Sequence, residues 1–419
     1  MQHASTARGP RRSRTARGLT ITASTSLLLA ALPSGVAAAG SSDTWVVHPG
    51  ESIQAAVDQA QSGDTIEIEA GTYQEAVCID GKGLTIVGAG RGSDGTKIVW
   101  PEWNTPSDLP EVESTPCWEA QNAADPEGDP ATLKDDVSGL FFLNPDGPVA
   151  VRRLATGNHP AHGIAAWGAD GFRVRKTLGY GHGRYGILAA NSTHSSISRN
   201  IEMGAGRGTA GISVSDSDDS YTYVASNHVE DYNLGIFVRE ARVGAIENNY
   251  VTENCVGILI FDDAATEIPD ASRNVEAGDW EVNANKSEAN SKYCLAGIGE
   301  VQSALRVSGT GMSVVNADHV SIWGNTLSAN RPSADPAELD FPAGGLTLLS
   351  LPPFNNPANV DPGPVENVSV EDNTITGNVP IDVLVGSPSV SPYLAEVGEN
   401  VEFRGNSCGA SNPPEICGS

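Results

Sequence analysis

Gly139-Leu140-Phe141-Phe142 opens the stretch that decides the fold, residues 139–263, in which a glycine followed by a mostly apolar triplet occurs six times. The later copies are Gly163-Ile164-Ala165-Ala166, Gly186-Ile187-Leu188-Ala189, Gly211-Ile212-Ser213-Val214, Gly235-Ile236-Phe237-Val238 and Gly257-Ile258-Leu259-Ile260. Successive glycines are 24, 23, 25, 24 and 22 residues apart. Such a regular period is typical of repeat architectures, in which each unit buries its apolar face on its neighbours.

A second motif lies between the glycines and is a short alternating segment that ends in asparagine. Its asparagines are Asn200, Asn227, Asn249, Asn325, Asn373 and Asn406. Asparagine tolerates left-handed backbone and its amide bonds to local backbone, so one per unit predicts a side-chain ladder at one corner. Each unit has room for about three short strands.

The two motifs together predict an all-β, single-domain, right-handed parallel β-helix with long loop insertions. In this fold Ile187, Ile212, Ile236 and Ile258 form one interior column. A leucine-rich repeat has a similar period, but the chain lacks its helical segment and dense leucines. A β-propeller has longer units with paired hairpin signals, which are also missing.

Residues 1–39 have the pattern of a secretory signal peptide, with five arginines, an apolar run over 19–32 and Ala37-Ala38-Ala39 before Gly40. Residues 40–419 are then the β-helix domain. Removing the signal leaves 25 − 5 = 20 basic against 52 acidic residues, a net charge of −32. This charge argues against nucleic acid or an anionic membrane as a partner, and we expect a secreted monomer.

The chain contains six cysteines, an even number that predicts disulfides in an exported protein. Six cysteines allow 15 pairings, and we expect neighbours to pair: Cys78 with Cys117, Cys255 with Cys294, and Cys408 with Cys417. Residues 52–61 predict a short amphipathic helix, capped by Ser52, that covers the open end of the stack. Insertions are expected at about 101–135, 263–278, 291–310, 331–343 and 351–364.

The first coils carry a family resemblance. Val47-His48-Pro49-Gly50-Glu51-Ser52-Ile53-Gln54-Ala55-Ala56-Val57, Gly63-Asp64-Thr65-Ile66, Ala70-Gly71-Thr72-Tyr73-Gln74-Glu75 and Leu84-Thr85-Ile86-Val87-Gly88 resemble the opening coils of the pectin-lyase-like superfamily. With the later coils, the resemblance covers most of the mature chain. It implies the fold and leaves the reaction open, because the superfamily includes lyases, hydrolases, esterases, epimerases and non-catalytic proteins.

In the related enzymes the saccharide groove follows the sheet that corresponds to the glycine triplets. Asp216, Arg239 and Asp262 are the candidate catalytic residues at the end of this sheet. Asp216 and Asp262 lie two coils apart, about 10 Å at ~4.8 Å per strand. Side-chain tilt could bring their carboxylates into the range of an inverting glycosidase, roughly 6.5–9.5 Å. Arg239 could bind a uronate carboxylate or act as a base resembling that of polysaccharide lyases.

Other polar and aromatic residues are expected to line the same groove. The candidate substrate-binding residues are Trp167, Asn191, Phe237, Phe261, His162, Arg184 and Tyr185. A polysaccharide lyase also needs the sugar carboxylate neutralised, often by calcium, and Asp216, Asp262 and Asp263, with Asp218 and Asp219, could supply its oxygen ligands. Each set also has a structural interpretation: aspartate favours turns, Arg239 could form an ion pair, and the aromatic residues could form a second core under loops.

The chain departs from the known subgroups. Gly181-His182-Gly183 and Asp262-Asp263 are similar to polygalacturonase motifs but occur in the reverse order. The Gln-Asp-Thr of pectin methylesterases and the Asp-Pro-His-His of alginate epimerases are absent. The leading hypothesis is an exported protein that binds an extended polysaccharide and cleaves it as a lyase or glycoside hydrolase. The alternative is a non-catalytic adhesin or glycan-binding scaffold, which loops sealing the sheet would favour.

Overall fold

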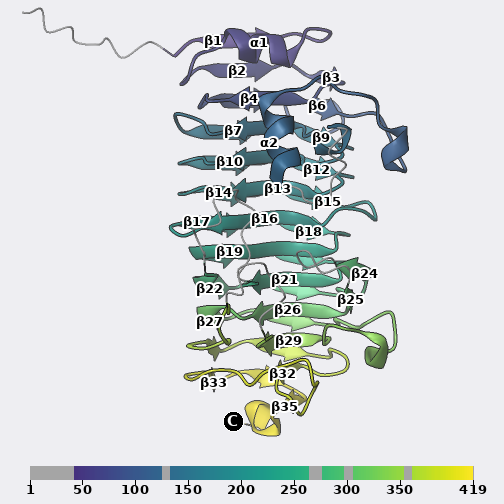
Figure 1. Cartoon of the computed structure of the whole chain (residues 1–419), viewed down its shortest axis with the longest axis vertical. Helices are drawn as coiled ribbons and strands as arrows, with labels where there is room; N and C mark the ends of the chain where they lie inside the picture. Colours follow the sequence, from purple (N-terminus) through teal and green to yellow (C-terminus); the bar gives the residue numbers. More distant parts are fainter. Residues whose placement is uncertain (1–41, 125–132, 264–275, 297–304, 353–360, 419) are drawn as a thin grey trace, which may run out of the picture. The chain divides into compact units, whose positions relative to one another are not determined.

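The computed structural model describes residues 42–124, 133–263, 276–296, 305–352 and 361–418, and the predicted signal peptide lies outside these ranges. Within residues 42–418 the chain winds into coils that stack along one axis (Figure 1). The coil strands pair in parallel with the strands of neighbouring coils and form three sheets, here called A, B and C. The predicted parallel β-helix is therefore confirmed.

The strands of sheet A are β1 Thr44–Val47, β2 Thr65–Ile68, β5 Thr85–Gly88, β8 Val149–Arg152, β11 Phe172–Arg175, β14 Ser196–Ser198, β17 Thr222–Ala225, β22 Gly278–Asn283, β27 Asp318–Trp323, β30 Ser369–Glu371 and β33 Glu402–Arg404. Those of sheet B are β3 Gly71–Tyr73, β6 Thr96–Val99, β9 Ala155–Gly157, β12 Leu178–Tyr180, β15 Ile201–Met203, β18 His228–Glu230, β20 Tyr250–Thr252, β23 Lys286–Glu288, β28 Thr326–Ser328, β31 Thr374–Thr376 and β34 Ser407–Cys408. Those of sheet C are β4 Val77–Asp80, β7 Leu140–Leu143, β10 Ile164–Trp167, β13 Tyr185–Ala190, β16 Ala210–Ser217, β21 Val256–Phe261, β26 Thr310–Val315, β29 Gly344–Leu349, β32 Val383–Val385 and β35 Ser411–Asn412. Strand β19, Leu234–Glu247, runs from sheet C into sheet A and joins them.

Helix α1, Ile53–Gln59, covers the first coils as predicted, and the Ser52 side chain caps it by accepting a hydrogen bond from the Ala55 amide. Helix α2, Pro116–Ala124, lies within the stretch that the sequence predicted as a loop. Short 3-10 helices occur at Pro106–Asp108, Lys134–Asp136, Pro336–Glu338 and Pro414–Gly418.

The interior contains the predicted isoleucine column. Ile187 pairs with Ile212, Ile212 with Ile236, and Ile236 with Ile258, and all four are fully buried. Full burial of a side chain of this size contributes about 2 kcal/mol before the entropy cost of ordering it. The period of the glycine triplet is therefore the period of one coil.

The asparagine ladder is also confirmed, at the corner between sheets A and B. Asn249 is a typical member: its Nδ2 donates to the carbonyl of Val224 at 2.9 Å and to Oδ1 of Asn285 at 2.9 Å. Its own Oδ1 accepts from the backbone amide of Asn227 at 3.0 Å. The same contacts connect Asn200, Asn227, Asn249, Asn285, Asn325, Asn373 and Asn406.

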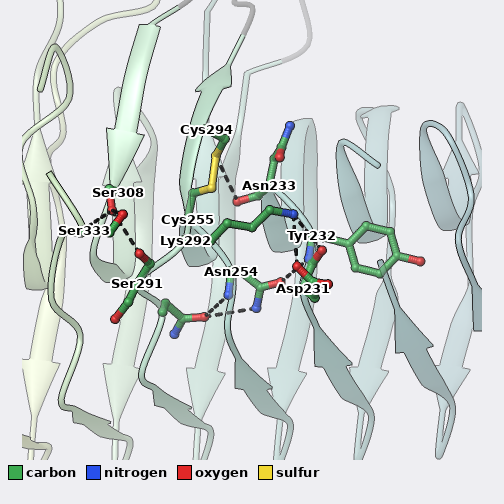
Figure 2. Close-up of a disulfide and its surroundings, with 11 residues drawn as sticks. Asp231, Tyr232, Asn233, Asn254, Cys255, Ser291, Lys292, Cys294, Ser308 and Ser333 are labelled. Atoms are coloured by element: carbon green, nitrogen blue, oxygen red, sulfur yellow. Dashed lines mark hydrogen bonds and ion pairs between the residues drawn. A yellow bond between two sulfur atoms is a disulfide. The ribbon is translucent and has the colours of Figure 1, made fainter. Parts of the chain in front are cut away.

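All three predicted disulfides are present: Cys78–Cys117, Cys255–Cys294 and Cys408–Cys417. The middle one holds an antiparallel hairpin, β24 Tyr293–Ala296 and β25 Leu305–Ser308, against sheet C. Figure 2 shows Lys292 beside this disulfide, and its Nζ donates to the carbonyl of Asp231 at 2.8 Å. A covalent bond and a charged side chain thus fix the hairpin to the coils.

Candidate functional site

The outward face of sheet C, the predicted groove, is covered in this structure. No residue of its central column is more than 8% exposed; the column consists of Phe141, Ala165, Leu188, Ser213, Phe237 and Leu259. Near the N-terminal coils, Trp118 of α2 packs on Phe141 with ring centroids 6.4 Å apart. Farther along, Cys294 and Val307 of the β24–β25 hairpin belong to the same apolar cluster as Phe237. The outward face therefore forms a second core.

Three of the predicted aromatic binding residues, Phe237, Phe261 and Trp167, belong to this second core or pack against it. Phe237 and Phe261 are 7% and 4% exposed, with ring centroids 6.4 Å apart. Trp167 is half-buried and packs against the cluster around Trp118. Burying rings of this size contributes packing energy whether or not a ligand is present. Their positions fit the structural interpretation of these residues.

His162, Arg184 and Tyr185 lie together beneath the α2 segment. His162 donates from Nε2 to Oε1 of Gln121 at 2.8 Å, and its ring stacks on Tyr185 with centroids 5.2 Å apart. Arg184 donates from Nη2 to Oδ1 of Asp136 at 3.1 Å. Burial, and then the Arg184 charge, lower the pKa of His162 well below its usual value. These contacts hold the first insertion on the coils.

The polar end of sheet C contains the candidate catalytic residues. Arg239 pairs with Phe261, and Ser215 with Arg239, so Asp216, Glu240 and Asp262 follow one another on successive coils. Asp216 and Glu240 both have left-handed backbone, with φ of 54° and 47°. Asn191, half-buried with φ of 44°, occupies the preceding coil of this column. The register thus brings the carboxylates to one turn, as the sequence predicted.

These groups are buried and contact their own chain. Asp216, Arg239 and Asp262 are 2%, 8% and 1% exposed. Arg239 donates to both carboxylate oxygens of Asp263, at 3.3 Å from Nε and 3.0 Å from Nη2. Oδ2 of Asp262 accepts from the backbone amide of Ala277 at 3.0 Å. The cluster therefore connects β19 to Asp263 and Asp262 to Ala277.

Glu240 is the member of this cluster that the sequence reading did not select. It is fully buried, and its Oε1 accepts from the Asp263 amide at 2.8 Å. Burial, followed by the charges of Asp262 and Asp263, raises the pKa of Glu240 to about 12. Glu240 is therefore a neutral acid at pH 7, beside acidic neighbours. The sequence signal for Glu240 was its position, because it follows Arg239 in the same turn column, between Asp216 and Asp262.

A second interior ladder, at the corner between sheets B and C, was also missed. Asn254, Asn290, Asn330 and Asn378 bond in sequence through Nδ2 and Oδ1, and Asp382 accepts from the last. Each of the four lies five residues after a member of the first ladder, a spacing visible in the sequence. Toward the N-terminal coils, His159 and His182 stack at the same corner, with centroids 5.6 Å apart. Burial lowers the pKa of His159 to about 4.

Calcium at Asp216, Asp262 and Asp263 stays a prediction. Within the described ranges, no group of three or more His, Cys, Asp or Glu side chains is arranged to hold a metal ion. A hollow of about 580 Å³ lies beside α2, lined by Lys82, Glu113 and Trp118 among others, and none of the candidate residues borders it.

Among the described residues, none of the helices has the length and the hydrophobicity that a membrane span requires.

Comparisons with known proteins agree with the architecture. The family model described as periplasmic copper-binding protein (NosD) matches residues 129–270. A mutant of the periplasmic alginate epimerase AlgG has a TM-score of 0.51 at 12% identity, over 87% of this chain and 77% of that chain. A variant of the catalytic domain of a GH87 α-1,3-glucanase, in complex with tetrasaccharides, has a TM-score of 0.50 at 14% identity, over 90% and 66%. No curated protein matches the sequence.

The chain is therefore a right-handed parallel β-helix, the fold that the resemblance of its opening coils predicted. The copper named in the NosD description does not fit the described residues. Imidazoles suit copper, and His159, His162 and His182 are close in sequence, but they form no metal-holding group. We therefore derive no step through a metal.

Proposed function

We propose that the protein is an exported, monomeric β-helix that binds an extended polysaccharide without cleaving it. The observation that carries this proposal is the burial of Asp216, Arg239 and Asp262 beneath a covered sheet C. An extended chain cannot reach these side chains while the described contacts persist. Three disulfides fit an oxidising compartment. The likeness to an epimerase of alginate and a glucanase bound to tetrasaccharides motivates the ligand class.

The energetics of the Arg239–Asp263 pair favour a structural role. A uronate could bind Arg239 only by displacing a carboxylate that already accepts from two of its nitrogens. Separating one partner of a buried ion pair costs about 3–5 kcal/mol. A ligand contact would have to offset this cost and the loss of the Asp262–Ala277 bond. These costs favour a structural role for Arg239, Asp262 and Asp263 in the described contacts.

The test combines binding and product analysis on a panel of acidic and neutral polysaccharides. The mature chain is expected to bind at least one of them by calorimetry and to release neither new reducing ends nor unsaturated sugars. Asp216→Asn and Asp262→Asn are expected to lower the melting temperature and leave the affinity of the folded variant unchanged. Cleavage by the wild type that these substitutions abolish would overturn the proposal, and binding to no glycan would overturn it as well.

One observation favours polysaccharide cleavage as a second candidate. Burial, followed by the charge of Asp262, raises the pKa of Glu240, so Glu240 carries a proton beside the Asp262 carboxyl, and a proton-bearing acid next to a second carboxyl is what a glycosidase requires. Glu240→Gln, which keeps the shape and removes the acid, would then abolish product formation on a glycan that the wild type cleaves.

A further inference from the structure

A group of cations lies on the outward face of sheet A, opposite in charge to the rest of the chain. We call Arg152, Arg153, Arg173, Arg175, Lys176 and Arg199 the basic face, and all six side chains are exposed. Arg152 pairs with Arg175 on the next coil. Arg153, Lys176 and Arg199 occupy the following turn on three successive coils, each with left-handed backbone. Neighbouring members of a column are thus about 4.8 Å apart.

The cations of the basic face have no carboxylate partners among the described residues. The salt bridges among the described residues involve other basic residues, such as Arg242 with Asp279 and Arg306 with Asp340. Asp170, three residues before Arg173, instead accepts from Thr193 and contacts the ring of His194. Leaving six like charges together opposes folding, so their positions are unexplained by stability alone.

The composition makes this grouping stand out. Twenty basic residues remain in the mature chain, 25 − 5, against 52 acidic ones, and six of the twenty lie on this face. Farther along sheet A the equivalent outward positions are neutral residues or the acidic Glu247, Glu281 and Glu371, and Arg404 of the last coil is ion-paired with glutamates. The charge therefore changes sign along one sheet. A polyanion would be attracted to the first part and repelled by the second.

A groove continues the basic face around the corner between sheets A and B. It has a volume of about 380 Å³, and its lining includes Arg91, Arg199, His228 and Tyr250. Arg91 reaches this corner from the β5–β6 connection, where its Nη1 donates to the carbonyls of Thr177 and Arg199 at 3.0 and 2.8 Å. Two backbone bonds thus fix a seventh cation beside the column.

Exposed aromatic rings border the basic face on the next coil. Tyr223 is 40% exposed and follows Arg173 and Ser196 in the same outward column. Tyr221 is 53% exposed and stacks on His194 with centroids 5.3 Å apart. Exposed aromatic rings offer apolar platforms to sugar rings, and arginine offers a planar fork to carboxylate or sulfate.

We propose that the basic face is a docking surface for an anionic polysaccharide, bearing carboxylates or sulfates, that runs across the coils of sheet A. Its negative groups repeat on a scale similar to the distance between neighbouring coils, so several can be met at once. The inference rests on the proposed glycan binding and places it on a face separate from sheet C. Five of the six cations are arginines, which favours two-pronged contacts over simple charge attraction.

The experiment measures the affinity of the mature chain for polygalacturonate, dextran sulfate and neutral dextran at two salt concentrations. The variant Arg173→Glu with Arg175→Glu is expected to weaken polyanion binding by about tenfold or more at low salt, with a smaller change at high salt. The matched control is Arg331→Glu with Arg404→Glu, two exposed arginines elsewhere that give the same change in net charge. The control is expected to lose less than about threefold.

Each outcome decides the point. Equal loss in both variants would show that net charge alone matters and would overturn the basic face. Unchanged binding in the Arg173 and Arg175 variant, or binding to neutral dextran alone, would overturn it while leaving glycan binding intact. Tighter binding to duplex DNA or to anionic vesicles than to either polyanionic glycan would overturn the choice of partner. No binding to any glycan would overturn both this inference and the proposed function.

Discussion

Replacing Glu240 with glutamine isolates the energetic cost of the buried carboxyl group at the end of sheet C. Glutamine has nearly the same shape, and its carbonyl oxygen can accept from the Asp263 amide as Oε1 of Glu240 does. It cannot ionise. Any difference between the variant and the wild type that changes with pH therefore reports the carboxyl group alone.

The sign follows from the two pKa values. The folded chain holds the Glu240 proton up to a pKa of about 12, whereas the unfolded chain releases it near 4.5. The wild type therefore loses stability as pH rises above 4.5, because the folded state binds the additional proton. Between pH 5 and pH 8 this loss amounts to roughly 4 kcal/mol for one proton. Glu240→Gln lacks this loss.

The assay is thermal unfolding of the wild type and Glu240→Gln at pH 5 and pH 8. The variant's melting temperature relative to the wild type is expected to be several degrees higher at pH 8 than at pH 5. Glu281→Gln, at an exposed position of β22, controls for the change in net charge. A difference that is the same at both pH values would refute the assignment of Glu240 as a buried neutral acid.

Three further substitutions test the coil architecture. Asn285→Ala removes the acceptor of the Asn249 side-chain amide and the donor to the Ile246 carbonyl. The free energy of unfolding should fall by about 1–3 kcal/mol for each buried group left unpaired. The fall should be larger than for Asn406→Ala at the end of the ladder. Gly163→Ala places a Cβ 2.6 Å from the carbonyl oxygen of Gly186 and should lower the melting temperature by several degrees. In the control Gly92→Ala, the Cβ meets nothing within 4 Å, and the melting temperature should not change. Equal effects of the two substitutions would contradict the packing. Cys255→Ser with Cys294→Ser should cost about 2–4 kcal/mol and speed tryptic cleavage at Lys292 and Arg306, while unchanged cleavage would show that the hairpin is held otherwise.

Periodicity made the interior of the coils predictable. A residue that faces inward in one coil has its counterpart one period later, so the Ile187 column and the first asparagine ladder follow from spacing alone. The second ladder obeys the same rule. Its signal was the five-residue offset of Asn254 and Asn290 from Asn249 and Asn285.

The spacing of the repeats could not predict that insertions cover the outward face of sheet C. Strand alternation shows that Phe237 points outward, but it does not show whether an insertion lies on it. That depends on the disulfide from Cys255 to Cys294 and on contacts such as His162 with Gln121, which join distant segments. The same residues therefore fitted both an open groove and a second core, and burial decided between them.

The basic face was hidden by the net charge, which describes the whole chain and not its distribution. Arg153, Lys176 and Arg199 are each 23 residues apart, in phase with the glycine repeat. Reading charge at the coil period, instead of summing it, would have predicted a cationic column. Repeat proteins gather widely separated residues into one surface in this way.

Side-chain footprinting by hydroxyl radicals tests most directly whether an anionic polysaccharide lies on sheet A. The exposed residues Tyr221 and Tyr223 border the basic face, whereas Tyr293 and Tyr393, 44% and 76% exposed, lie elsewhere. With saturating polyanion, oxidation of Tyr221 and Tyr223 is expected to fall several-fold while that of Tyr293 and Tyr393 stays constant. Unchanged oxidation of Tyr221 and Tyr223 in a complex shown to be saturated would contradict the account.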